Sequence, residues 1–408
     1  MLYNLAISIY LLGVRVAAFF RPKSKAAYMV RGHRQVFGIL KRQLDPKVDY
    51  IWFHAASLGE FEQGRPLIEW IRANHPEYRI LQTFFSPSGY EVRKDYSGAD
   101  VVCYLPLDTP INAYRFVEAA RPRMAFFIKY EFWRNYLNRL HKKQIPVYSV
   151  SSVFRPNQIF FRWYGRDYRN VLKSFTHLFV QNQLSKDLLS RIGITNTTIV
   201  GDTRFDRVLD IYKAAKLLPI VELFKQDKPT IVAGSSWSPD EELLVDYFNN
   251  HPEIKLIIAP HVVNEERLAE IESKLKRSYV LYTQAGEEKM KQADCLIIDG
   301  YGLLSSIYRY GEIAYVGGGF GAGIHNVLEA AVYGIPVVFG PNNRKFREAR
   351  HLLEVEGGFE VQDTASFSRV MDRLLIDKDF LEKAGRAAGD YVRDHSGALH
   401  KILKKIEF

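Results

Sequence analysis

Short apolar runs recur along the chain from residue 50 onward, and they alternate with segments in which apolar residues repeat at helical spacing. The apolar runs are rich in β-branched and aromatic residues and do not alternate with polar ones, which indicates strands covered on both faces and therefore parallel sheets. We predict seven strands in each half of the chain: 50–56, 79–85, 100–105, 123–129, 146–151, 177–181 and 197–201, then 229–234, 254–259, 278–282, 294–298, 312–317, 336–340 and 358–362.

Strands separated by helices in this way predict the α/β class, with two doubly wound, Rossmann-like domains. The boundary falls near 203–228, where a helical segment leads into a charged turn. We therefore expect an N-terminal domain at 49–205 and a C-terminal domain at 206–408, which ends in amphipathic helices. Two such domains facing each other would bind ligands in a cleft between the carboxyl ends of their sheets.

The first twenty residues are apolar except for Asn4, Ser8 and Arg15, which fall on one narrow stripe at helical spacing. A signal peptide carries its positive charges before the apolar part, whereas the first positive side chain here is Arg15. We predict a helix that lies in the membrane interface. A core helix of the first domain and a true membrane span are the alternatives, and Arg15 makes a span costly.

The net charge of +10 is concentrated near the start of the chain, because residues 1–48 hold nine basic side chains and one acid, Asp45. Nucleic acid is one possible partner for such a cluster, but it does not require the neighbouring apolar run. An anionic lipid surface explains both features. We therefore predict a membrane-associating segment at 1–48 and no nucleic-acid partner. The basic residues are Arg15, Arg21, Lys23, Lys25, Arg31, Arg34, Lys41, Arg42 and Lys47.

Several classes of chemistry are disfavoured by the motifs that the sequence lacks. Cys103 and Cys295 form no CxxC pair or zinc spacing, which favours a reduced, cytosolic setting. The sequence has no P-loop, GxGxxG, GxSxG or HExxH motif. Its only Asp-x-Asp, at 377–379, falls in a late helical segment. We expect neither a metal site nor a cofactor.

Two glutamates follow strands of the predicted first sheet. Glu60 comes after strand 50–56, next to Gly59 at the start of a helix, and Glu131 comes after strand 123–129. Both would emerge at the carboxyl edge of the sheet, where Glu60 is well placed to take a proton from a hydroxyl group. The alternative for each is a first-turn carboxylate that only complements the helix dipole.

Polar residues also follow the strands of the second half. Ser235 and Ser236 come directly after strand 229–234, where their hydroxyls and free amides can hold a phosphate. Ser238 and Glu241 fit a capping box for the next helix, and an ordinary capped helix is the alternative. His261 follows strand 254–259 and points to the same region, although a single histidine in this position is more often structural.

A glycine-rich loop at 317–323, which includes Gly318 and Gly319, follows the strand-like run 313–316 and opens a helical segment. Glycines let the backbone approach a ligand closely, and a helix start offers free N–H groups to an anion. Asn326 and Glu329 lie three residues apart, so they would share a helix face and reach one sugar together. The pattern indicates a nucleotide-sugar site, and the alternative is a glycine-rich turn with a polar cap.

These residues occur in five segments whose order resembles the Kdo (3-deoxy-D-manno-octulosonic acid) transferases of lipopolysaccharide synthesis. Residues 54–60 resemble the family's H-A-x-S-x-G-E, and residues 318–329 its G-G-H-N-x-x-E. The resemblance covers nearly the whole chain. The other three segments resemble E-x-E-x-W-P, G-N-x-K-F-D and G-S-T-H-x-G-E-E, at 130–133, 201–206 and 234–241.

The chain departs from the family pattern at several positions. Lys129 and Tyr130 replace the family's Thr or Glu-Thr before Glu131, and Arg134 replaces its Pro after the Trp. The Arg beside Pro260 is missing, Leu303 stands for a Glu, and residues 322–324 are inserted before His325.

The resemblance implies the GT-B architecture and an inverting, metal-independent glycosyltransferase. It would move Kdo from CMP-Kdo to a lipid A precursor at the cytoplasmic face of the bacterial inner membrane. Glu60 would be the general base, and Glu131 would orient Glu60 or the acceptor. Ser235, Ser236, His261 and the loop that carries Gly318, Gly319 and His325 would surround the donor phosphate, with Asn326 and Glu329 on the ribose.

Three other interpretations remain. One is a UDP-sugar transferase of the same fold acting on a lipid-linked acceptor. Another is a sugar-nucleotide epimerase, which has no need of an apolar, basic start. A non-enzymatic lipid-binding module leaves the glutamates at the strand ends unexplained.

Overall fold

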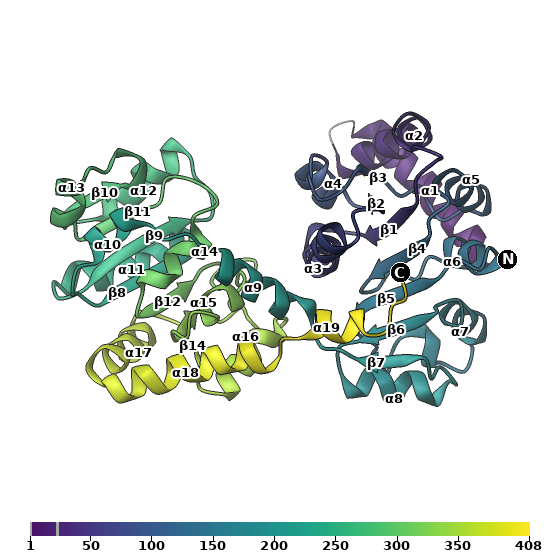
Figure 1. The fold of residues 1–408 in the computed structure, drawn as a ribbon. Helices are drawn as coiled ribbons and strands as arrows, with labels where there is room; N and C mark the ends of the chain where they lie inside the picture. Colours follow the sequence, from purple (N-terminus) through teal and green to yellow (C-terminus); the bar gives the residue numbers. More distant parts are fainter. Residues whose placement is uncertain (1, 22–23) are drawn as a thin grey trace. The chain divides into compact units, whose positions relative to one another are not determined.

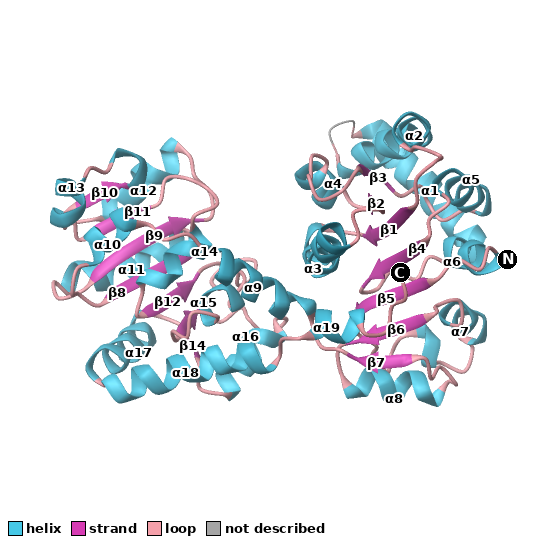
Figure 2. Ribbon diagram, in the orientation of Figure 1, coloured by secondary structure: helices cyan, strands magenta, loops and turns pink. Residues whose placement is uncertain are grey.

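The computed structural model describes residues 2–21 and 24–408. The chain forms two compact units, Met1–Arg207 together with Gly397–Phe408, and Val208–Ser396. Figures 1 and 2 show that each unit is a sheet flanked by helices. Of the basic residues at 1–48, Lys23 and the side chain of Lys25 lie outside the described part.

All seven strands of the first sheet are parallel and follow the order β3-β2-β1-β4-β5-β6-β7. The strands are β1 (Tyr50–Ala55), β2 (Arg79–Phe84), β3 (Val101–Tyr104), β4 (Met124–Ile128), β5 (Val147–Ser152), β6 (His177–Val180) and β7 (Thr197–Ile199). The helices of this unit are α1 (Leu2–Phe20), α2 (Lys25–Gln43), α3 (Leu58–Asn74), α4 (Pro87–Arg93), α5 (Pro110–Ala120), α6 (Arg134–Lys142), α7 (Arg166–Leu172), α8 (Gln183–Arg191) and α19 (Ala398–Leu403).

The second sheet is also parallel, in the order β10-β11-β9-β8-β12-β13-β14. Its strands are β8 (Thr230–Ser236), β9 (Lys255–Pro260), β10 (Tyr279–Leu281), β11 (Cys295–Ile297), β12 (Ile313–Val316), β13 (Val337–Phe339) and β14 (Gly358–Glu360). Its helices are α10 (Pro219–Lys225), α11 (Ser238–Asn250), α12 (Glu265–Lys274), α13 (Glu287–Gln292), α14 (Leu304–Ile307), α15 (Leu328–Ala331), α16 (Arg347–Glu354), α17 (Thr364–Ile376) and α18 (Lys378–Asp394), and α9 (Thr203–Ala214) crosses between the units.

Every predicted strand is present, with bounds within two residues of the prediction. Their side chains are buried on both faces because helices cover both faces of each sheet. In the first unit, Trp52 packs with α2, α5 and α6 on one face, and Phe53 packs with α3 and α19 on the other. A fully buried side chain of this size contributes about 1.5–3 kcal/mol. The α/β class with two Rossmann-like domains is therefore confirmed.

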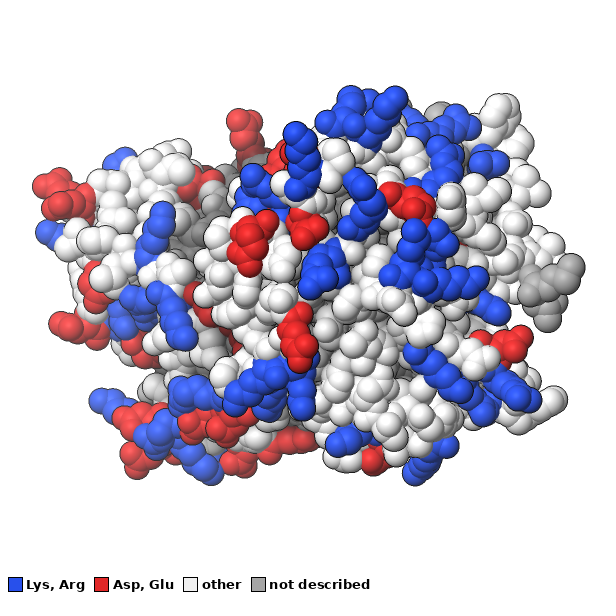
Figure 3. All heavy atoms as spheres, turned by 45° about the vertical axis from the view of Figure 1, so that its right-hand side comes forward, with Lys and Arg blue, Asp and Glu red and all other residues white. Residues whose placement is uncertain are grey.

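The amino-terminal helix α1 packs along one side only. The described side chains that face its neighbours are half-buried, whereas Leu12, Phe19 and Phe20 are largely exposed. Its segment Tyr3–Phe20 is long and apolar enough to cross a membrane, a test that core helices and signal sequences also pass. Because these large apolar side chains are exposed, α1 is not a core helix. In Figure 3, the part of the first unit that holds α1 and α2 is mostly uncharged surface and basic side chains.

The end of the chain differs from the predicted domain boundaries. The prediction assigned all of 206–408 to the second domain, but Gly397–Phe408 belongs to the first unit. Ala398 and Ile402 of α19 complete the apolar layer over Tyr148 and Phe179. An amphipathic helix shows in its sequence that it packs against something, but not which sheet it covers.

Asp206 fixes this returning segment. Its carboxylate, on α9, accepts hydrogen bonds from the N–H groups of Gly397 and Ala398, at 3.0 and 3.1 Å. These two amides start α19 and have no partner within the helix. Asp206 therefore joins the two points at which the chain passes from one unit to the other.

We expect Asp206→Ala to lower the free energy of unfolding by about 1–2 kcal/mol, because it leaves two helix-start amides without an acceptor. Asp206→Asn keeps one acceptor oxygen and should lose less. Urea unfolding and hydrogen exchange at residues 397 and 398 measure both effects. Wild-type stability and unchanged exchange in Asp206→Ala would show that this contact does not hold α19.

Candidate functional site

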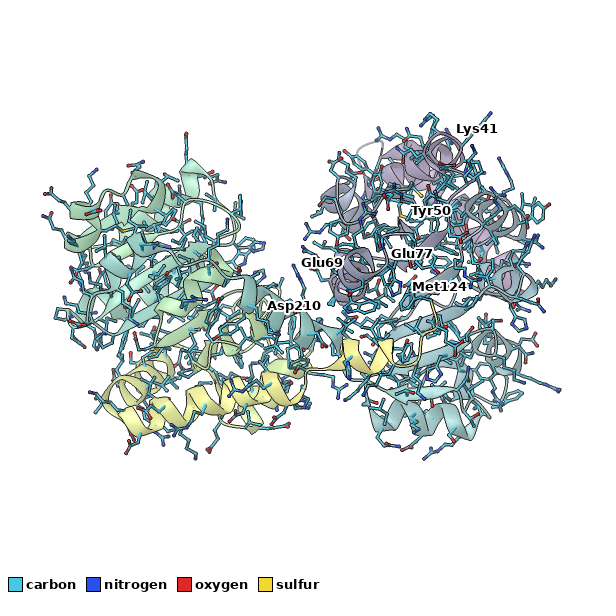
Figure 4. All side chains as sticks on the ribbon, viewed as in Figure 1. Lys41, Tyr50, Glu69, Glu77, Met124 and Asp210 are labelled. Carbon is cyan, nitrogen blue, oxygen red and sulfur yellow. The ribbon has the colours of Figure 1, made fainter. Side chains whose placement is uncertain are left out.

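The candidate residues gather where the strand order reverses in each sheet. The chain leaves β1 toward β2 and β3, then crosses back to place β4 on the other side of β1. In the second sheet β8 likewise lies between β9 and β12. Loops diverge at such a point and leave room for a ligand at the carboxyl edge. Figure 4 labels Tyr50 and Met124 at the starts of β1 and β4, so the site of the first unit lies at the other end of these strands.

Glu60 lies in the first turn of α3, directly after β1, and its side chain is half-buried. Its Oε2 accepts hydrogen bonds from the amides of Ala56 and Ser57, at 2.8 and 3.1 Å, and from the Ser57 hydroxyl at 3.4 Å. The carboxylate therefore caps α3, as the alternative interpretation expected. Oε2 accepts all three hydrogen bonds, and Oε1 accepts none of the three.

Glu131 follows β4, the strand that pairs with β1, and its charge acts on Glu60. It is only 8% exposed, and its Oε2 is 3.2 Å from Nε2 of His54. The indole N–H of Trp133 donates to the same oxygen. His54 is fully buried in β1, and its Nδ1 is 2.9 Å from the Thr83 hydroxyl. The imidazole and the indole therefore fix the Glu131 carboxylate in place.

The surroundings of Glu60, including Glu131, change its protonation. Burial raises the pKa of Glu60 above its ordinary value, and the negative charge of Glu131 raises it further. His54, Lys129 and the hydrogen bond from the Ala56 amide act in the opposite direction, yet the pKa remains raised. A carboxylate with a raised pKa is a better general base near neutral pH.

The ammonium of Lys129 acts on Glu60 and lowers the pKa of that carboxyl. Lys129 directly follows β4 with a left-handed backbone, at φ 67°, and its ammonium lies 5.5 Å from the centre of the Tyr130 ring. The guanidinium of Arg155 lies at the same distance from this ring and donates to the Tyr130 hydroxyl. Lys129 and Tyr130 are the positions at which the chain departs from the family pattern, and here they bring positive charge to an acidic site.

Three aromatic rings stack at the carboxyl edge of the second sheet. The ring centres of Trp237 and His261 are 4.8 Å apart, and those of His261 and His325 are 4.3 Å apart. The Trp237 indole N–H donates to Nε2 of His325 at 3.1 Å, so the proton of a neutral His325 lies on Nδ1. Burial lowers the pKa of His325, which favours this neutral form. His261 and His325 thus lie together, and Trp237, which no sequence pattern indicated, stacks with them.

Asp240 joins the two loops of this edge and was also missed. Its buried carboxylate accepts from the amides of Trp237 and Gly318, each at 2.9 Å, and from the Tyr315 hydroxyl at 2.8 Å. At Gly318, φ is +92°, and a Cβ would lie 2.4 Å from the Gly323 carbonyl oxygen. A Cβ on Gly319 would lie 2.5 Å from Gly340 Cα. These glycines therefore let the loops pack against each other, whatever ligand they also contact.

The two serines that end β8 differ in their surroundings. Ser235 is half-buried with φ 52°, and it remains a candidate phosphate contact. Ser236 is buried, and its hydroxyl donates to Glu241 at 2.8 Å, so that hydroxyl is not free for a phosphate. Glu241 also pairs with Arg267. The predicted capping box of Ser238 and Glu241 is therefore wrong, because Asp240 caps α11 through the Trp237 amide.

Asn326 and Glu329 are in contact, but they do not share a helix face as predicted. Helix α15 is four residues long and begins at Leu328, so Asn326 precedes it. The Asn326 amide donates to Glu329 at 2.9 Å, and its oxygen accepts from the Leu328 amide. Asn326 is exposed at the same loop end as His325. Across the described residues, no group of three His, Cys, Asp or Glu side chains is arranged to hold a metal ion.

Comparison with known proteins identifies the relatives of the chain. The family model for 3-deoxy-D-manno-octulosonic acid transferases matches residues 31–207. The Haemophilus influenzae enzyme of this name is 27% identical over 373 residues, which cover 88% of this chain and 86% of the relative. The Aquifex aeolicus enzyme is 29% identical and covers 84% of this chain and 91% of its own. The chain is therefore a homologue of the Kdo transferases over most of its length, and the resemblance is confirmed.

A solved structure supports the fold. UDP-GlcNAc 2-epimerase from Neisseria meningitidis, bound to UDP-GlcNAc, superimposes with a TM-score of 0.58 at 14% identity. The match covers 87% of this chain and all of the epimerase chain. At this identity the likeness shows the fold alone, which agrees with the predicted GT-B type.

The geometry at Glu60 predicts a titration that needs no substrate. Carbon-13 NMR of the Glu60 carboxyl should give a midpoint above the ordinary range for glutamate, because burial and Glu131 both disfavour the charged form. Glu131→Gln removes the nearby charge and should lower that midpoint. An unchanged or higher midpoint in this variant would show that Glu131 does not act on Glu60.

Proposed function

We propose that this homologue of the Kdo transferases moves Kdo from CMP-Kdo to a lipid A precursor, at the cytoplasmic face of the bacterial inner membrane. The homology supports a glycosyltransferase of lipopolysaccharide synthesis. The observation that carries the catalytic proposal is the position of Glu60, at the carboxyl edge of the first sheet with a raised pKa and Glu131 beside it.

In the proposed reaction, a sugar hydroxyl of the acceptor attacks the anomeric carbon of Kdo. Its proton passes to Oε1 of Glu60 as the new C–O bond forms. The bond between the anomeric carbon and the CMP phosphate oxygen breaks, and CMP leaves with the electron pair. Attack from the side opposite the leaving group inverts the anomeric configuration. Glu131, held by His54, raises the basicity of Glu60 and orients it.

The second unit would bind the donor. Ser235, the amides of the loop at 317–323 and Nδ1 of His325 would surround the single phosphate of CMP-Kdo, and Asn326 with Glu329 would contact the ribose. The exposed rings of Trp237 and His261 would border this site. Backbone amides and hydroxyls arranged around one phosphate stabilise a leaving group electrostatically, so no metal enters the proposal.

The start of the chain would hold the enzyme at the membrane. Exposed apolar side chains on α1, with arginines beside them, suit the interface of an anionic bilayer. Trp163 and Tyr164, 89% and 59% exposed, lie just before Gly165, the N-cap of α7. Tyr168 of that helix contacts the Tyr3 ring on α1. Tryptophan and tyrosine are favoured at the interface between a membrane and water.

A sugar-nucleotide epimerase is the second candidate, because the Neisseria enzyme shares the fold. A transferase for UDP-sugars is the third. Equilibrium competition separates them from the main proposal: CMP should displace a bound nucleotide probe at lower concentration than UDP. Stronger displacement by UDP would favour either of the other two.

Glu60→Gln should lower kcat for Kdo transfer by about 10²–10⁴-fold, because amides do not accept the proton, while CMP binding stays unchanged. Glu77→Gln is the matched control, since Glu77 is an exposed glutamate after α3, labelled in Figure 4. Initial rates and CMP titration measure both variants. Turnover near that of the wild type in Glu60→Gln would remove the proposed base.

Replacing Phe19 and Phe20 with serine should weaken binding to anionic vesicles by at least about tenfold. Each substitution removes apolar surface that the bilayer would otherwise bury. Leu217 and Ile376, equally exposed in the second unit, provide the control pair. Deletion of residues 2–20 should release the protein from membranes. Unchanged sedimentation with vesicles in both variants would contradict the membrane role.

A further inference from the structure

A small cavity lies in the first unit between α1, α2 and the segment after β3. Its volume is about 130 Å³, well above the roughly 10–15 Å³ that a single water molecule needs. Apolar side chains form much of its lining, among them Leu11 and Val14 of α1 and Val30 of α2. These side chains suit the hydrocarbon part of a ligand.

The charged side chains around the cavity are all positive. Arg15 and Arg34 line it from two different helices, and no acid belongs to its lining. Within residues 2–21 and 24–408, neither arginine forms an ion pair with a carboxylate. Two unpaired guanidinium groups beside one cavity favour an anion with several oxygens, such as a phosphate.

His33 adds an unused polar group. Its Nε2 is buried, and no hydrogen-bond partner for it exists in the described part of the chain. Burial lowers the pKa of His33 to about 4. A buried polar atom without a partner costs free energy, which a ligand that bonds to it would recover.

The cavity is tightly packed on one side, and ring contacts link its lining to the candidate site at Glu60. A Cβ on Gly32 would lie 2.2 Å from the Tyr104 ring, so α2 packs tightly against the end of β3. The His33 ring lies 5.8 Å from that of Phe85, and Phe85 lies 4.8 Å from Trp133. Trp133 donates to Glu131. Two ring contacts therefore separate the cavity from the carboxylate beside Glu60.

We propose that this cavity binds a phosphate group carried by a lipid, and that in the proposed function this is a phosphate of the acceptor. Arg15 and Arg34 pair with the phosphate oxygens, and the ring of His33 lines the cavity beside them. The hydrocarbon lies along Leu11, Val14 and the exposed apolar face of α1. The same helix that contacts the membrane thus forms one wall of the acceptor site.

Kinetics with two acceptors test this site. With a phosphorylated lipid A precursor in detergent micelles, Arg34→Gln should raise KM at least about tenfold and leave kcat unchanged, because a charged hydrogen bond is lost. With the dephosphorylated acceptor, Arg34→Gln and the wild type should behave alike. Arg123→Gln is the control, since Arg123 is exposed at the amino edge of the same sheet. An equal loss on both acceptors, or no loss, would overturn the proposal.

A binding measurement keeps this test independent of Kdo transfer. In full-length protein labelled at histidine, short-chain phosphatidate should raise the titration midpoint of His33 above 4, with the resonance assigned by His33→Gln. Inorganic phosphate alone should shift it much less, because it lacks the hydrocarbon. No shift with phosphatidate, or an equal shift with both probes, would overturn a lipid phosphate site. If the wild type transfers no Kdo but His33 responds, only the proposed function fails.

Discussion

A fully buried imidazole holds one carboxylate next to another at the carboxyl edge of the first sheet. His54 contacts Glu131, and Glu131 together with burial raises the pKa of Glu60. Two carboxylates on a flexible chain would turn away from each other and so avoid their electrostatic repulsion. The strands prevent that movement, because β1 carries His54 and leads into α3, while Glu131 follows β4 as the neighbouring strand. The basicity of Glu60 thus depends on the order of the strands.

The strands themselves could be predicted from sequence because strands buried on both faces have a local pattern. The pattern does not contain the order of the strands, which depends on crossovers between distant segments. Glu60 and Glu131 were found because both follow a strand, but their proximity required β1 and β4 to be neighbours. The destination of α19 could not be predicted either, since the apolar surface that it covers comes from residues more than two hundred positions away.

Contacts over long sequence distances also explain the differences in the second unit. Asp240 was not among the residues chosen from the sequence, yet its carboxylate accepts hydrogen bonds from Tyr315 and Gly318, far along the chain. Ser236 was chosen for its position after a strand, but Glu241 occupies its hydroxyl. Trp237 carried no signal until its indole was seen to donate to His325. Residue type and position at a strand end indicate candidate ligand contacts. Only the fold shows which of these side chains already form hydrogen bonds within the protein.

Product analysis by mass spectrometry shows whether the protein transfers Kdo from CMP-Kdo to a lipid acceptor. Purified full-length protein is incubated with CMP-Kdo and a tetraacylated lipid A precursor in detergent. The proposal predicts a lipid product heavier by one or more Kdo residues, together with released CMP. An unmodified lipid, with a product formed only from a UDP-sugar, would contradict it.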